Sequence, residues 1–159
     1  MIHVESWLNV ADDLVSVQEF SGPVADQDYI EGAIELTISH KPMLTRDMVD
    51  YVDQLWAYLI RGLEEVLVGN EFSTYYPDMP IQIIFRPQGS DVTVIVDPQE
   101  WNRIASVPLD TLVGAMTSAG TMFFDKLRQY APNNSARYNR NISRLAALVE
   151  SMSRSRSDH

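Results

Sequence analysis

Apolar and polar residues alternate in several short runs of the chain, which is the period of a β-strand with one buried face. In one of these runs the even-numbered residues Ile34, Leu36 and Ile38 are apolar, and polar residues occupy most of the odd-numbered positions. We therefore expect the even positions to face the core, and Gly32 within the run to mark a bulge. Runs of this kind predict strands at residues 2–9, 14–20, 30–38, 81–86 and 92–96.

Three longer stretches repeat apolar residues every three or four positions, which is typical of amphipathic helices. The first follows Thr45, which we interpret as its N-cap, and carries Trp56 on the apolar face. Small residues from Gly114 to Gly120 make the middle of the second helix thin, so another element can approach it closely. These stretches predict helices at residues 46–68, 108–131 and 135–152.

Together these elements predict the α+β class, with a single antiparallel sheet of four to five strands packed against three helices. No linker, repeat or low-complexity block divides the chain, so we expect one domain over residues 1–152. Residues 153–159 are expected to form a disordered tail. With 159 residues, the chain is long enough to bury a core without disulfides or a structural metal.

Charge is distributed unevenly along the chain. The formal net charge is −10, and residues 1–40 contain eight Asp and Glu but no Lys or Arg. An acidic surface repels phosphate, which argues against nucleic acid and anionic membranes as partners and favours a basic protein. Many acidic proteins carry such charge for solubility alone, and that explanation stays open.

The location of the protein is inferred from three features of the sequence. The chain has no cysteine, no apolar run of the roughly 18 residues needed to span a bilayer, and no basic segment at Met1 typical of a signal peptide. We expect a soluble, cytoplasmic protein.

No catalytic or cofactor motif emerges. The three histidines form no metal-binding pair, and the calcium-loop pattern begun by Asp26 and Asp28 fails because Glu31 occupies the position that requires glycine. Glycine-rich phosphate loops and a GxSxG motif are also missing from the sequence. We therefore predict no cofactor, no metal and no enzymatic activity, although a carboxylate pair from separate elements stays open as an alternative.

The segment from Tyr75 to Pro80 is the most distinctive in the chain. Pro77 and Asp78 favour a turn, and Pro80 forces an extended residue just before the next strand, which is a purely structural explanation. Two adjacent tyrosines in a rigid acidic loop would also form an economical binding surface.

The strand at 29–38, the Trp56 helix at 47–68 and the Tyr75–Pro80 turn leading into the hairpin at Ile81 resemble small acidic immunity-type proteins. Those proteins are found beside bacterial polymorphic and contact-dependent toxins. The resemblance implies a protein without chemistry of its own, which binds a cognate toxin, often a basic nuclease, and occludes its active site.

Two functional hypotheses follow from the sequence. In the first, the chain is an immunity-type module that binds a basic protein partner. In the second, it is a structural or oligomeric protein, such as a homodimer, whose second and third helices form a self-interface that buries Leu145 and Val149. The predicted partner-binding residues of the first hypothesis are Asp12, Asp13, Asp26, Asp28, Tyr75, Tyr76 and Asp78.

Overall fold

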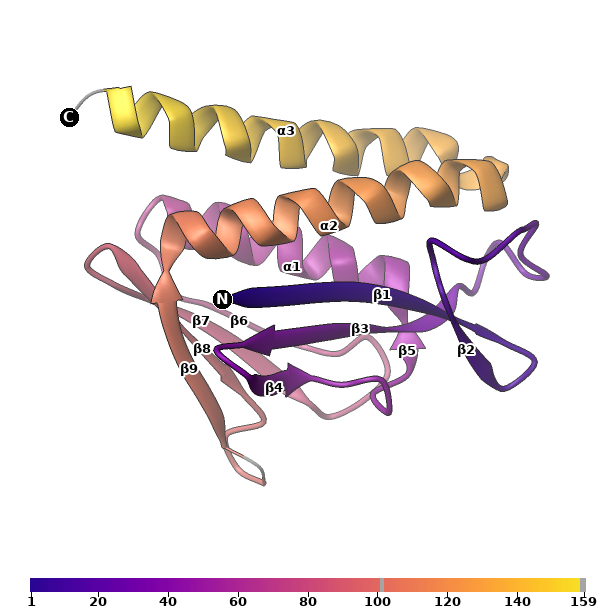
Figure 1. Cartoon of the computed structure of the whole chain (residues 1–159), viewed down its shortest axis with the longest axis horizontal. Coiled ribbons are helices and arrows are strands. Elements are labelled where there is room, and N and C mark those ends of the chain that lie inside the picture. The colour runs from indigo at the N-terminus through magenta and orange to yellow at the C-terminus, as the bar shows by residue number, and fades with distance from the viewer. Residues whose placement is uncertain (101, 158–159) are drawn as a thin grey trace.

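The computed structural model describes residues 1–100 and 102–157, which form three α-helices and two antiparallel sheets (Figure 1). The five-stranded sheet has the order β2-β1-β3-β4, with β5 also paired to β3, and the four-stranded sheet has the order β6-β7-β8-β9. The strands of the two sheets are β1 (Ile2–Val10), β2 (Asp13–Ser16), β3 (Glu31–Ile38), β4 (Lys41–Leu44), β5 (Asp50–Tyr51), β6 (Phe72–Tyr75), β7 (Gln82–Gln88), β8 (Asp91–Val96) and β9 (Arg103–Pro108). The helices are α1 (Val52–Leu67), α2 (Leu109–Tyr130) and α3 (Ser135–Ser157), with a short 3-10 helix η1 (Pro132–Asn134) before α3.

The α+β class and the three helices are confirmed, whereas the prediction of a single sheet is wrong. α1 lies between the two groups of strands in the sequence, and each group pairs only within itself. Four strands were not predicted: β4, β5, β6 and β9. β4, β5 and β6 have only two to four residues, too few for an alternating pattern to stand out, and β9 lies at the edge of its sheet.

The inner face of β3 is apolar as predicted, since Ile34, Leu36 and Ile38 are all fully buried. Gly32 has a different role from the bulge that we expected. A Cβ atom at this position would lie 2.0 Å from the carbonyl oxygen of Trp7, so only glycine permits the close pairing of β3 with β1. The irregularity in β3 lies instead between Leu36 and Thr37, where its pairing with β4 shifts.

α1 is the central element of the core. The Trp56 side chain is fully buried, and its Nε1 donates a hydrogen bond to Oγ of Ser6 on β1 over 3.0 Å. On another side of α1, Gly62 faces the rings of Phe72 and Phe85, so closely that a Cβ atom would lie 2.8 Å from each of them. α1 therefore packs against both sheets at once.

The start of α1 differs from the prediction. The helix begins at Val52 rather than at residue 46, and Thr45 is not its N-cap. Before the helix, Asp50 and Tyr51 pair with β3, and the Val52 backbone N–H donates to the carbonyl of Ile30. These sheet hydrogen bonds compete with helix formation in this segment, although the apolar period alone is compatible with a helix.

α2 and α3 form an outer helical layer above α1 and the five-stranded sheet (Figure 1). Gly120 confirms the close approach expected for the thin middle of α2, because a Cβ atom there would lie 3.0 Å from Leu145 and from Trp56. Residues 153–157, which we expected in a disordered tail, continue α3 in the structure, and 158–159 lie outside the described residues. No helix within the described residues is long and apolar enough to cross a membrane.

Candidate functional site

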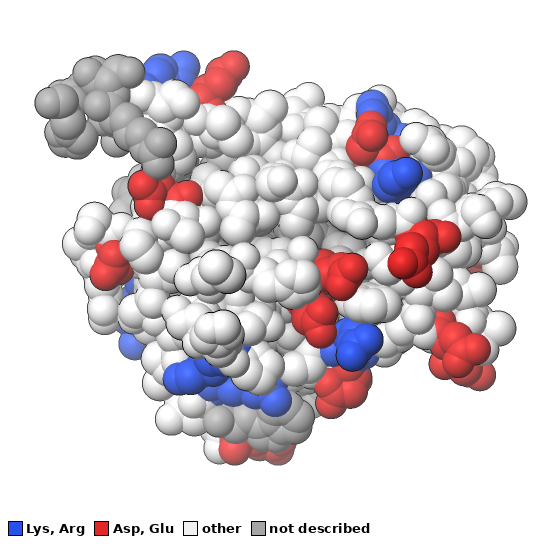
Figure 2. All heavy atoms as spheres, in the orientation of Figure 1, with Lys and Arg blue, Asp and Glu red and all other residues white. Residues whose placement is uncertain are grey.

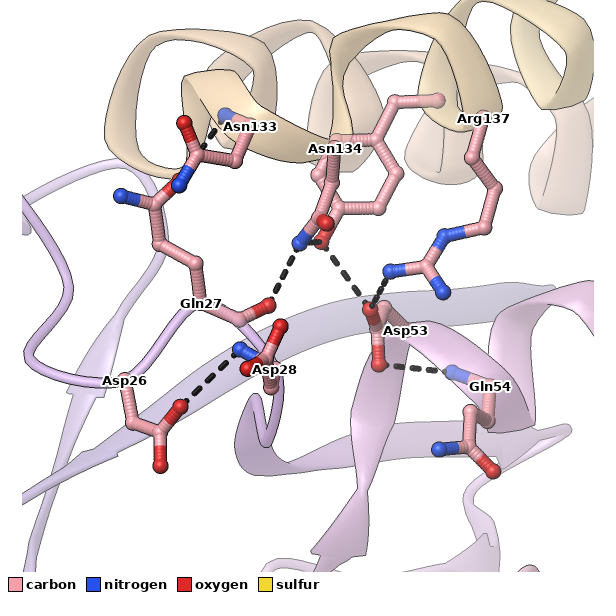
Figure 3. A network of polar contacts seen from close by, with 9 residues as sticks. Asp26, Gln27, Asp28, Asp53, Gln54, Asn133, Asn134 and Arg137 are labelled. Atoms are coloured by element: carbon pink, nitrogen blue, oxygen red, sulfur yellow. Dashed lines mark hydrogen bonds and ion pairs between the residues drawn. The ribbon is translucent and has the colours of Figure 1, made fainter.

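The loop from Ser21 to Ile30 is held in place by contacts with the helical layer (Figure 3). The side-chain oxygen of Gln27 accepts a hydrogen bond from the backbone N–H of Asn133, and its carbonyl accepts one from the side chain of Asn134. At the C-terminal end of α2, the carbonyl of Tyr130 accepts from the N–H of Val24, and the Tyr130 hydroxyl donates to the carbonyl of Phe20, the residue before the loop. The loop is therefore fixed at three points before any ligand binds.

A pocket of about 380 Å³ lies between this loop and the ends of β1 and β3. Buried Leu8 and Ile30 belong to its lining, whereas Asp26 and Glu31 bring carboxylates that are exposed to solvent. Its volume falls at the lower end of the range of about 300–1,000 Å³ that is typical of ligand pockets. The lining residues are Leu8, Asn9, Val10, Ala11, Phe20, Pro23, Val24, Ala25, Asp26, Tyr29, Ile30 and Glu31.

Two tyrosines lie beside this pocket. Tyr29 is 60% exposed, and its ring centroid is 5.8 Å from that of Tyr51. Tyr51 is opposite Glu31 in the register of β5 with β3. Partial burial and the negative charges of Asp78 and Glu31 raise the pKa of Tyr51 above its ordinary value. The electrostatic field around this aromatic pair is therefore negative.

Asp78 is held beside this region by a hydrogen bond to Asp50. The Asp50 carboxylate, which is buried, accepts hydrogen bonds from the backbone N–H groups of Tyr51 and Asp78 over 2.7 and 2.9 Å. A second, smaller pocket of about 130 Å³ is lined by Glu31, Tyr51 and Asp78 among others, so Glu31 belongs to both pockets. We call the continuous surface formed by Asp26, Tyr29, Glu31, Tyr51 and Asp78 the Tyr29 surface.

The acidic side chains do not form one uniform patch. Figure 2 shows that on the face drawn there they lie in several separate groups, with surface of other residues between them. A partner that meets this side of the molecule therefore contacts uncharged residues as well as charged ones. Charge alone therefore does not define the site.

Asp53 is a buried carboxylate that the sequence analysis did not single out. It accepts hydrogen bonds from the Tyr138 hydroxyl over 3.0 Å, from Arg137 over 3.1 Å and from the backbone N–H of Gln54 over 2.9 Å (Figure 3). Burial and the charge of Asp53 raise the pKa of Tyr138 to about 12. Because its oxygens are engaged by donors of the protein, Asp53 connects α1 with the start of α3 and has the arrangement of a structural group.

The predicted acidic residues are exposed, but they do not all lie together. Asp12 and Asp13 are at the turn of the β1–β2 hairpin, and Asp26 and Asp28 belong to the fixed loop, where the Asp26 side chain accepts the Asp28 backbone N–H. Asp78 joins Asp26 on the Tyr29 surface. Of the predicted acids, only these two are part of that surface.

The predicted tyrosine anchor is wrong in part. Tyr75 is 55% exposed, at the end of β6, but Tyr76 is only 3% exposed and its hydroxyl points to the sulfur of Met48. Burial raises the pKa of Tyr76 above its ordinary value. Its side chain belongs to the core and cannot serve as a partner contact in this structure. Tyr29 and Tyr51 are the tyrosines placed among exposed acids, and their shared surface depends on strand pairing that the sequence pattern does not reveal.

The exposed face of the five-stranded sheet holds one group that could bind a metal. Nε2 of His3 lies 3.9 Å from Oε2 of Glu5 and 3.6 Å from Oε1 of Glu35, because Glu5 and Glu35 are direct partners in the β1–β3 register. These three ligand atoms lie within 4.8 Å of one another. Arg46 also lies 3.5 Å from Glu35, so a cation already compensates part of this negative charge.

Folding is predicted to be independent of this group. Because the three side chains lie on the surface of a sheet whose core is already packed, metal binding there has little folding energy to add. Thermal unfolding followed by circular dichroism should give superimposable curves with and without EDTA. A fall in Tm of several degrees on chelation would contradict the prediction, and the variant His3→Ala would then identify the site.

The fold and the Tyr29 surface together define the class of the molecule: an α+β protein with a preformed, acid-rimmed pocket beside exposed Tyr29 and partly buried Tyr51. We found no matching protein-family model and no significant match among curated proteins or solved structures. The function is therefore argued from the chemistry of this surface.

Proposed function

We propose that this chain is a non-enzymatic protein-binding module, most concretely an immunity protein that binds a basic bacterial toxin in the cytoplasm and occludes its active site. The observation that carries the proposal is the Tyr29 surface, in which exposed Tyr29 and partly buried Tyr51 lie beside carboxylates that form no ion pair with a Lys, Arg or His of the described residues. Such carboxylates can be compensated by the charges of a partner.

The two kinds of group in this surface have different expected roles in binding. Exposed acids attract a cationic partner over several ångströms and mainly raise the association rate. Exposed aromatic side chains such as Tyr29 supply large contact area with few rotatable bonds, and they mainly slow dissociation. A fixed loop also loses little conformational entropy on binding. These properties support a protein partner over a phosphate-rich one.

Replacing Asp12, Asp13 and Asp28 together by Asn should slow association with the partner by up to about tenfold at low salt and flatten the dependence of the rate on salt. Tyr29→Ala should instead accelerate dissociation by about tenfold, as for a moderate interface hot spot. Both rates can be measured by surface plasmon resonance against the product of the neighbouring gene. The matched control removes the same number of charges elsewhere, in the triple variant Asp91→Asn, Glu100→Gln and Glu150→Gln.

Co-expression with the neighbouring gene tests the immunity role directly. We expect a stable complex and loss of that product's toxicity. A chain that binds no product of a neighbouring gene and leaves toxicity unchanged would contradict the proposal.

A self-associating structural protein is the second candidate. A groove of about 540 Å³ runs between α2 and α3, and Val149 in its lining is 48% exposed. However, Leu145, the other residue expected in a self-interface, is already fully buried within the chain. Sedimentation velocity of the wild type and of Val149→Asp distinguishes the two candidates, since only a helical self-interface would be lost in the variant.

A further inference from the structure

We propose that the 380 Å³ pocket of the Tyr29 surface is the anchor site for one arginine side chain of the protein partner. The inference rests on the proposed protein-binding function and specifies its chemistry. The aliphatic part of the arginine would lie along the apolar lining, and its guanidinium would meet the carboxylates of Asp26 and Glu31 beside the ring of Tyr29.

The shape of the pocket fits one long side chain. Its volume is too small for a helix or a strand of a partner, and its lining between Val10 and Val24 is mostly apolar. An arginine covers apolar surface with its methylene groups while its charged end stays near water. Val10 is 38% exposed in the free protein, so covering it with such a stem removes apolar surface from water.

The charges of the pocket select a cation. Asp26 and Glu31 are its only ionisable acids, and neither forms an ion pair within the described part of the chain. Each has one carboxylate oxygen oriented by a neutral donor: the Asp28 backbone N–H bonds to Oδ1 of Asp26, and Nδ2 of Asn9 bonds to Oε2 of Glu31. Neutral donors orient the carboxylates and leave their negative charge uncompensated.

Arginine satisfies these groups better than lysine does. A guanidinium has five N–H donors in a plane, so it can serve carboxylates on more than one side and also stack on a tyrosine ring. An ammonium is a compact point charge with three donors. The presence of Tyr29 in the lining therefore favours arginine.

The pocket is also formed in advance. The hydrogen bonds of Gln27 with Asn133 and Asn134 hold one part of the loop, and the Val24 N–H bond to Tyr130 holds another. In addition, Gly22 approaches the Tyr130 ring so closely that a Cβ atom would lie 2.7 Å from it. A rigid wall lowers the entropic cost of receiving a flexible side chain.

The test uses the full chain and the capped peptide Gly-Ser-Arg-Ser-Gly, with two matched peptides that carry lysine or citrulline in place of the arginine. Citrulline has nearly the same shape as arginine but no charge. In two-dimensional NMR titrations we expect the arginine peptide to shift the amide signals of the pocket lining with saturation. The citrulline peptide should bind at least about tenfold more weakly, as expected for loss of a charge-assisted hydrogen bond.

The double variant Asp26→Asn and Glu31→Gln preserves side-chain shape and should weaken binding of the arginine peptide to the level of the citrulline peptide. The variant Asp91→Asn, in which an exposed residue at the start of β8 is changed, should bind like the wild type. Comparison of the NMR spectrum of each variant with that of the wild type also reports whether the variant stays folded. Equal binding of the arginine and citrulline peptides, lysine binding as tight as arginine, or tighter binding of free spermidine would each overturn the inference.

Failure of the inference can be separated from failure of the proposed function. If the double variant binds the neighbouring gene product as tightly as the wild type does, the anchor pocket is wrong and the immunity proposal stands. If the arginine peptide binds the pocket but no neighbouring gene product does, the immunity proposal is wrong and the pocket assignment stands.

Discussion

Replacing Trp56 with alanine should lower the free energy of unfolding by about 3–5 kcal/mol, the range measured for truncating large aromatic residues in a protein core. The Trp56 side chain is fully buried, and its ring is stacked with that of Phe123 at a centroid distance of 6.1 Å. Alanine would leave a cavity between α1, α2 and β1. It would also leave the buried Oγ of Ser6 without the indole donor.

Urea unfolding followed by circular dichroism measures this loss. Tyr58 lies on the same helix but is 36% exposed, so Tyr58→Ala is the matched control and should cost less than about 1.5 kcal/mol. Trp56→Phe keeps most of the packing and removes the hydrogen bond to Ser6. A loss below about 1 kcal/mol for Trp56→Ala would contradict the central position of α1.

Replacing Asp53 with alanine should cost about 2–3 kcal/mol, because it leaves the buried Tyr138 hydroxyl without its acceptor. The same change removes the acceptor of the Gln54 N–H in the first turn of α1, where a negative charge favours the helix dipole. Arg137 is 48% exposed, so water can replace its partner, and Arg137→Ala should cost less than about 1 kcal/mol. Equal losses in the two variants would contradict this assignment.

Alkaline pH gives a second measurement of the same network. An unfolded tyrosine titrates near its ordinary pKa of 10, whereas the pKa of folded Tyr138 is about 12. The folded state therefore retains this proton more strongly, and the associated stability is present below pH 10 and is lost as pH rises toward 12. In Asp53→Asn the negative charge that helps to raise this pKa is removed, so the alkaline loss should be smaller than in the wild type.

The hydrogen bonds around Asp53 also link the stability of the fold to the loop of the candidate site. Asn134 bonds both to the Tyr138 hydroxyl and to the carbonyl of Gln27 in the loop beside the pocket (Figure 3). Asp53 variants should therefore weaken partner binding in addition to lowering stability. Arg137→Ala leaves these bonds in place and should bind like the wild type.

The sequence by itself determined the local structure where one period dominates. The even positions of β3, the bounds of α2 and the start of α3 all agree with the hydrophobic pattern, because each segment buries a single apolar face. The burial of Trp56 follows from the same pattern. The exposed acids Asp26 and Asp78 were also identified, since charged side chains are rarely buried without partners.

Only the tertiary structure decided which strands pair and which side chains meet. The strands divide into two sheets, both of which pack against α1, and the apolar period of α1 does not specify how many layers cover it. Tyr51 and Glu31 become neighbours through the register of β5 with β3. The adjacent tyrosines Tyr75 and Tyr76 differ in exposure, because successive residues of an extended chain point to opposite sides. Tyr76 thus lies in the core, and Tyr29 and Tyr51, which are distant from it in sequence, form the surface beside the pocket.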